Sequence, residues 1–527
     1  MESDNRLSHI NNGAIDFYIA LKIECKVNYN KLCEIIQNKI DNYTKAYNNS
    51  MYNRLETTLQ TAISGSEFED YLKTKKNFAT PKKSLIIEDS QYKEELCGFK
   101  IDNDNNKVGI TPISRLEKYY SETFEEIKAN HKTSLQIYGS SYVNCQRRFM
   151  LPPIELNFTN GAVDLLTAVL TIFTNNTAIL RLTLPLNNVA ATLLMANEID
   201  SYISNAKTLP GFPVALEDKD INSIEKCYYK FLFSSKKIKS IRKYSTITNI
   251  ILANYSTGFD DIKKIPDETK EDIYKISIAP IPDRDGLSYR EDALSYFITN
   301  GTFINGVAYL IGSIGRCVSI VDNTTINHVK EQFKKEYKDS SDEAPDEHFI
   351  YKKIIQDIRI NVEYSILILL LKIANENYTF EQKGIHLHNP EKVKNDYYTD
   401  KIFISLLQNS AYGSVRELTA DFEDRMKFLL DSENVGERME AINCIVENNK
   451  NRKIEQLQNI ISILGLVITI VFGLPAINDT LSLIRELCAF IENDIPYLTI
   501  DNCSFSIWLT FSIGLPLFLW FKSKFRK

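Results

Sequence analysis

Apolar residues are most concentrated near the C-terminal end of the chain. Residues 460–477 read IISILGLVITIVFGLPAI, and no charged residue occurs between Glu455 and Asp479. A second uncharged run covers residues 503–521. Each run has about the twenty residues that a helix needs to cross the hydrocarbon core of a bilayer. The pattern predicts two transmembrane helices, 460–477 and 503–521, joined by an acidic external loop, 478–502.

The charges that flank the two runs predict their orientation. Basic residues lie on the sides away from the loop: Lys450, Arg452 and Lys453 before the first run, and the tail 522–527 after the second. Under the positive-inside rule, both basic flanks are cytoplasmic. We therefore expect a multi-pass protein in a lipid membrane with both termini in the cytoplasm. Cys488 and Cys503 would lie on the outer side, and whether they pair stays open.

Residues 414–459 have the pattern of a long stalk helix. Apolar residues recur there at heptad-like spacing: Val415, Leu418, Phe422, Met426, Leu429, Val435, Met439, Ile442 and Val446. No proline occurs before Pro475, so a helix continuous from Ser414 to Ala476 would be about 95 Å long at 1.5 Å per residue. Such a seam predicts partner helices, which we expect to come from further copies of the chain.

A stripe of polar and small residues follows another face of the same helix. Its members step by threes and fours: Asn448, Asn451, Glu455, Gln458, Ser462, Gly465, Thr469, Phe472 and Ala476. In a ring of parallel helices this face would line a pore, with a constriction around Thr469, Phe472 and Gly473. In a lone helix the same residues serve helix packing, and this alternative stays open.

The larger N-terminal part mixes strand and helix patterns. Leucines alternate with other residues over 180–186, and residues 303–321 contain two apolar runs separated by glycines, which is typical of a hairpin. We expect an α/β or α+β sensor domain over 1–337 and a helical linker or support region over 338–413. The net charge of −6 argues against a direct nucleic-acid partner.

Two basic clusters are candidates for holding an anionic ligand. The first combines hydroxyl and cationic side chains: Ser234, Ser235, Lys236, Lys237, Lys239, Ser240, Arg242 and Lys243. The second is the pair Arg147 and Arg148. Such groups hold phosphate or adenylate, but a solvated basic loop has the same composition, so both interpretations stay open.

Signals for metal binding and catalysis are weak. His386 with His388, and the acidic run 283–286, are most simply a loop and a turn, so any metal site stays unknown. The sequence contains neither GxGxxG nor the P-loop pattern, and it has no HExxH helix or nucleophile elbow. We therefore do not expect an enzyme.

A large N-terminal body, a long helix entering a first span, a loop, a second span and a basic tail resemble the CorA superfamily over residues 398–527. The resemblance implies a homo-oligomeric, pentameric channel for Mg²⁺ or other divalent cations in the bacterial inner membrane. The Gly-Met-Asn signature of that family is absent. Gly473-Leu474-Pro475 stands in its place, so only Gly473 matches and selection of hydrated magnesium is in doubt.

The large body and the missing motif also resemble the CorA-like effectors of type III CRISPR systems. That resemblance implies an antiviral channel gated by a nucleotide second messenger, such as an S-adenosylmethionine–AMP conjugate, bound to the N-terminal domain. Two alternatives remain: a constitutive magnesium or divalent-cation transporter, and a membrane-anchored oligomeric scaffold without a pore.

Overall fold

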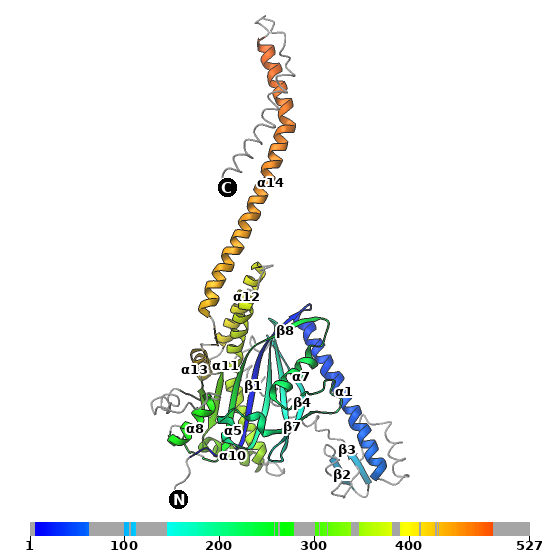
Figure 1. Cartoon of the computed structure of the whole chain (residues 1–527), viewed down its shortest axis with the longest axis vertical. Helices are drawn as coiled ribbons and strands as arrows, with labels where there is room; N and C mark the ends of the chain where they lie inside the picture. Colours follow the sequence, from blue (N-terminus) through cyan, green and yellow to red (C-terminus); the bar gives the residue numbers. More distant parts are fainter. Residues whose placement is uncertain are drawn as a thin grey trace. The chain divides into compact units, whose positions relative to one another are not determined.

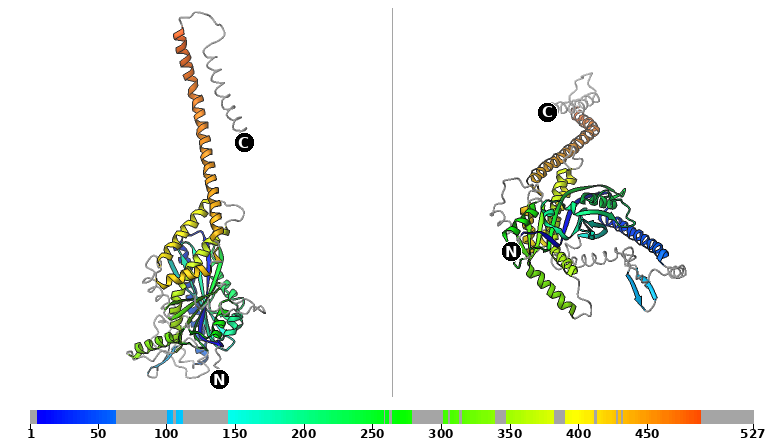
Figure 2. Two further views of the ribbon diagram at one scale, coloured as in Figure 1. Left: turned by 90° about the vertical axis from the view of Figure 1, so that its left-hand side faces the viewer. Right: turned by 60° about the horizontal axis from the view of Figure 1, so that its bottom comes forward.

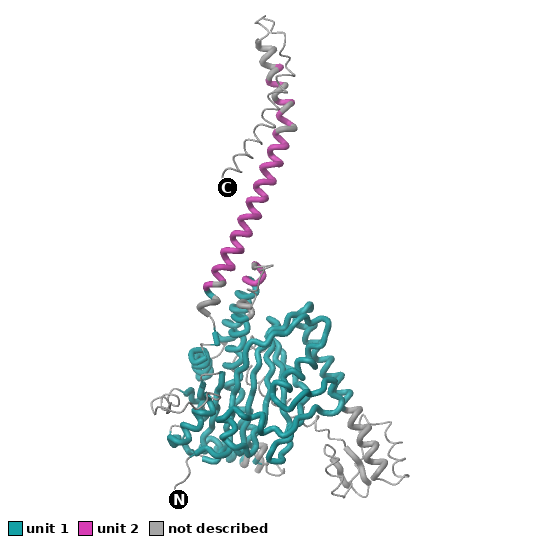
Figure 3. The backbone as a smooth tube through the Cα atoms, viewed as in Figure 1, with its two compact units in different colours: residues 1–387, 395–436 teal, residues 388–394, 437–527 magenta. Residues whose placement is uncertain are grey.

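A computed structural model gives the architecture of most of the chain (Figure 1). The residues that it describes are 6–62, 100–104, 107–111, 145–257, 259–261, 264–278, 301–304, 306–312, 315–338, 347–381, 390–410, 413–426, 429–430 and 432–488. They divide into two compact units, one of residues 1–387 with 395–436 and one of residues 388–394 with 437–527 (Figure 3).

The first unit is built on a large mixed sheet, which has nine strands in the described part. Across the sheet they follow the order β7 (Ile203–Thr208), β4 (Gln146–Phe158), β5 (Val163–Phe173), β6 (Thr177–Ala190), β1 (His9–Cys25), β8 (Ile238–Tyr255), β11 (Arg316–Val321), β10 (Val307–Ile311) and β9 (Thr302–Ile304). Neighbours pair antiparallel, except that β11 lies parallel to β8. A separate hairpin joins β2 (Lys100–Asp104) and β3 (Lys107–Thr111).

Helices cover both faces of the sheet (Figures 1 and 2). One face carries α1 (Tyr29–Ala62), α5 (Ala191–Met195), α6 (Ile199–Tyr202), α7 (Ile221–Phe233) and α8 (Asp267–Ile278). The other carries α10 (Asn323–Lys338), α11 (Glu347–Glu381), α12 (Pro390–Ser410) and α13 (Ser414–Arg425). Strand β1 serves both cores, because Ile15 and Ile19 point to the first face and Tyr18 and Ala20 to the second. Burial on both faces explains why β1 is apolar almost throughout.

The helix expected from Ser414 to Ala476 is two helices. Helix α13 ends at Arg425, and α14 begins at Ser432 and continues to Cys488, a length of 57 residues. The expected stalk 414–459 therefore contains a break between the two.

The prediction of membrane-spanning helices is corrected by the structure. Among the helices that are described, none combines the length and apolar character that a bilayer crossing requires. The segment 460–477 is the interior of α14, which passes Asp479 in the predicted external loop without ending. The calls of a multi-pass membrane protein, an inner-membrane location, and an ion channel are wrong on this finding. The second expected span, 503–521, and the tail 522–527 lie outside the described residues.

Candidate functional site

The first basic cluster lies where α7 ends and β8 begins. Several of its members already contact neighbours: Ser234 Oγ accepts a hydrogen bond from Lys39 Nζ at 2.8 Å, Lys243 Nζ lies 2.7 Å from Glu225, and Arg242 lies 3.7 Å from Glu24. The side chains of Lys236, Lys237 and Lys239 are exposed. Carboxylates therefore match part of the positive charge, and ligand binding by this cluster stays a prediction.

The second cluster is separated by strand geometry. Arg147 and Arg148 are neighbours on β4, and successive side chains of a strand point to opposite faces. Arg148 Nη1 reaches Glu363 of α11, 3.1 Å away, whereas Arg147 lies beside Cys33 of α1. The two guanidinium groups therefore do not converge on one ligand.

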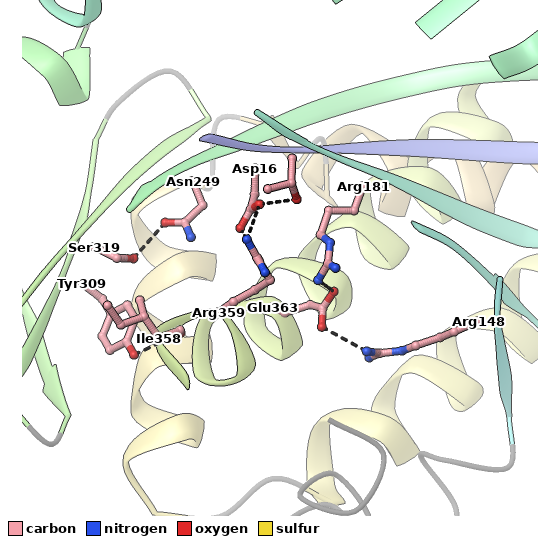
Figure 4. Close-up of polar contacts among 10 residues, drawn as sticks. Asp16, Arg148, Arg181, Asn249, Tyr309, Ser319, Ile358, Arg359 and Glu363 are labelled. Carbon is pink, nitrogen blue, oxygen red and sulfur yellow. Dashed lines mark hydrogen bonds and ion pairs between the residues drawn. The ribbon is translucent and has the colours of Figure 1, made fainter. Parts of the chain in front are cut away.

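A buried polar network crosses the sheet on the face that α11 covers (Figure 4). It begins at Asp16 of β1, whose cross-strand neighbours are Thr183 on β6 and Asn249 on β8. The Thr183 hydroxyl donates a 2.6 Å hydrogen bond to Asp16, and the Ser319 hydroxyl donates one of 2.8 Å to Asn249. The strand register thus places polar groups of β6, β1, β8 and β11 in one row.

Helix α11 supplies the opposite charges. Arg359 donates to both carboxylate oxygens of Asp16, from Nε at 2.8 Å and from Nη2 at 3.1 Å. One helical turn further on, Glu363 accepts from Arg181 and from Arg148, each at 3.1 Å. Such charge-assisted, two-point pairs fix both the distance and the rotation of the two groups. The network therefore sets the register of α11 on the sheet.

Burial makes the network a structural device. Each of its five charged side chains is at most 12 % exposed. The hydroxyl of Tyr18 and the amide nitrogen of Asn249 are buried beside it with no hydrogen-bond partner in the described part of the chain. Burial, with the nearby Asp16 charge, raises the pKa of Tyr18 well above 10.0. No nucleophile and base meet here among the described residues, so the arrangement holds elements together.

Sequence reasoning missed this network, although two signals point to it. Asp16 interrupts an apolar strand, and Arg359 and Glu363 stand four residues apart just before the apolar run of α11. Residues at that spacing lie on one face of a helix. In the described part of the chain, no group of three or more His, Cys, Asp or Glu side chains could hold a metal ion. The candidates His386, His388 and 283–286 lie outside that part.

Helix α14 presents a row of exposed apolar side chains. Five of them are 42 to 66 % exposed and follow strict heptad spacing: Ile454, Leu457, Ile461, Leu464 and Ile468. The predicted pore stripe lies on a neighbouring face, since Glu455, Ser462 and Thr469 each follow a seam residue by one position and are exposed. The Thr469 hydroxyl donates to the carbonyl of Gly465 at 2.8 Å, as expected for a helical threonine that bonds to its own backbone.

Comparison with known proteins yields no match to a family model, a curated protein or a solved structure. The resemblance to the CorA superfamily and to its CRISPR-associated members therefore stays a prediction.

Proposed function

We propose that this protein is a self-associating scaffold, in which a second copy packs in parallel against the heptad seam of α14. The observation that carries the proposal is the exposure of five large apolar side chains at regular spacing on one helix face. Apolar surface of this extent is unfavourable in water, and exposed patches of this kind mark interaction sites. Association would bring two α/β units into one particle.

The residue types at the seam favour a second copy as the occupant. Ile454, Ile461 and Ile468 stand at one core position of the heptad, and Leu457 and Leu464 at the other. β-branched residues at the first position with leucine at the second favour parallel, two-stranded coiled coils. In that arrangement the seam lies on the shared axis, and the polar stripe faces away from it.

Cysteine crosslinking of the full-length protein tests the arrangement. In a parallel, in-register pair the two copies of residue 457 face each other across the axis, so Leu457→Cys should form an interchain disulfide under mild oxidation. Glu455→Cys, two positions away and off the seam, is the matched control and should not exceed the unsubstituted chain. An antiparallel pair would give neither crosslink and would contradict the parallel arrangement.

Sedimentation of charge variants tests the seam itself. Leu464→Asp places a carboxylate on the axis and should abolish self-association, whereas Ser462→Asp places the same group off the seam and should leave it intact. A monomeric wild-type chain, or equal effects of the two variants, would refute the proposal. A particle of more than two copies that still depends on Leu464 would retain the seam and change only the copy number.

A further inference from the structure

The sheet face opposite α11 contains a hollow with a cation in its wall. The hollow measures about 260 Å³ including its open mouth, and residues of β1, α5, α6, β8 and β11 line it. Its walls are mainly apolar, with Phe17, Leu193 and Ile199 among them. The polar groups that reach it are Asn197, Thr248 and Arg316. An apolar hollow with a few polar groups is the usual composition of a small-molecule site.

Arg316, the first residue of β11, is bonded only to neutral oxygens. Its Nη1 donates to the carbonyl of Ile276 at 3.2 Å, and its Nη2 donates to the side-chain oxygen of Asn197. Neither partner carries charge, and no carboxylate pairs with Arg316 among the described residues. A guanidinium has five N–H donors, so most of its capacity is left for another acceptor.

The surroundings of Arg316 make this an unusual position for a cation. Burial lowers the pKa of Arg316 from 12.5 to about 10, and no neighbouring carboxylate offsets the effect. A partly buried charge costs free energy unless an opposite charge accompanies it. By contrast, the buried arginines of the α11 network all contact a carboxylate, as Arg359 does with Asp16. The missing partner of Arg316 is therefore an anion.

We infer that this hollow binds a small carboxylic acid, whose carboxylate pairs with Arg316 and whose short apolar tail contacts Phe17 and Leu193. A planar guanidinium matches the two oxygens of a carboxylate. The volume lies below the roughly 300 Å³ of ordinary ligand pockets, so the tail is limited to a few carbons. Asn197 fixes the position of the guanidinium from the mouth. This site goes beyond the proposed self-association and does not depend on it.

Calorimetric titration of the full-length protein with hexanoate tests the inference. We expect a Kd of about 1 mM or tighter, as suits a ligand of so few atoms. Acetate lacks the tail and hexanol lacks the charge, so each should bind at least tenfold more weakly. Inorganic phosphate has the charge without the apolar part and should also bind weakly. No heat with hexanoate at 10 mM, about ten times that Kd, would overturn the inference.

Variants then locate the site. Arg316→Met should weaken hexanoate binding at least tenfold, and Leu193→Trp should block the hollow while keeping the cation. Lys237→Met, which removes an exposed cation of the first basic cluster, is the control and should bind as the wild type does. Loss of binding in the control, or full binding in both hollow variants, would refute the assignment. The near-ultraviolet circular dichroism of each variant shows whether it has folded.

Discussion

Removing the cation of the Arg359–Asp16 pair should strongly destabilise the α/β unit. In Arg359→Met the Asp16 side chain, which is 0 % exposed, keeps only the Thr183 hydroxyl and neighbouring dipoles to balance its charge. Breaking a buried pair from one side costs about 3–5 kcal/mol, because a buried charge is left without compensation. A domain is stable by about 5–15 kcal/mol in total, so the loss is a large fraction.

The double variant separates charge from packing. Adding Asp16→Asn to Arg359→Met removes the stranded charge but keeps a side chain of similar shape. We expect the double variant to be about 1–3 kcal/mol more stable than the sum of the two single losses, since contacting residues couple by that order. Lys230→Met is the control, because the Lys230–Glu217 pair lies on the surface and should contribute nothing measurable.

Urea unfolding followed by near-ultraviolet circular dichroism measures these differences. The chain has 28 tyrosines and two tryptophans, and the tryptophans, Trp508 and Trp520, lie near the C-terminus. The tyrosine signal therefore reports mainly on the α/β unit, in which Tyr18, Tyr309 and Tyr364 are buried. A loss below about 1 kcal/mol in Arg359→Met, or simple additivity in the double variant, would refute the role given to the pair.

Three further predictions concern other parts of the α/β unit. Gly306 has φ of +76° and its missing Cβ would collide with Thr325, so Gly306→Ala should lower the unfolding free energy by more than about 1 kcal/mol. Burial raises the pKa of the Cys317 thiol to about 12, so at pH 8 it should resist alkylation until urea unfolds the chain, whereas exposed Cys444 should react at once; early loss of the Cys317 thiol in a mass spectrum would contradict this. Asp220 caps α7, and the hydrogen bond from Ser223 lowers its pKa below 3.8, so its contribution is complete well above pH 3.8 and is lost as the pH falls through the lower folded value; Asp220→Ala should cost about 1 kcal/mol at pH 7 and nothing below that range, in urea titrations at each pH.

Strand β6 shows how far the pattern of apolar positions predicts the fold. The alternating leucines over 180–186 correctly indicate a strand, but they also suggest that Arg181 and Thr183 face solvent. Both are buried, because α11 and β1 supply their polar partners. A paired buried charge and a solvated one look alike in a sequence. The strand also continues past Pro185 to Ala190, since pairing on both sides holds it extended.

The end of α13 and the hollow at Arg316 had no usable sequence signal. Between Arg425 and Ser432 the chain contains neither glycine nor proline, so heptad spacing alone predicts one continuous helix. Packing of Leu418 and Phe422 into the core under α11 fixes α13 instead. An arginine at the start of a strand is equally unremarkable until its missing carboxylate is seen in three dimensions.

The place of β1 in the sheet has a consequence for synthesis of the chain. This strand, His9–Cys25, leaves the ribosome early, but its two neighbours are β6 and β8, which ends at Tyr255. At about 5–20 residues per second, β8 is complete roughly 10 to 50 seconds after β1. For that interval β1 is an apolar strand with at least one open edge, a template for pairing between nascent chains. Slower temperatures and chaperone supply during translation should therefore govern the yield of folded protein more than the final stability does.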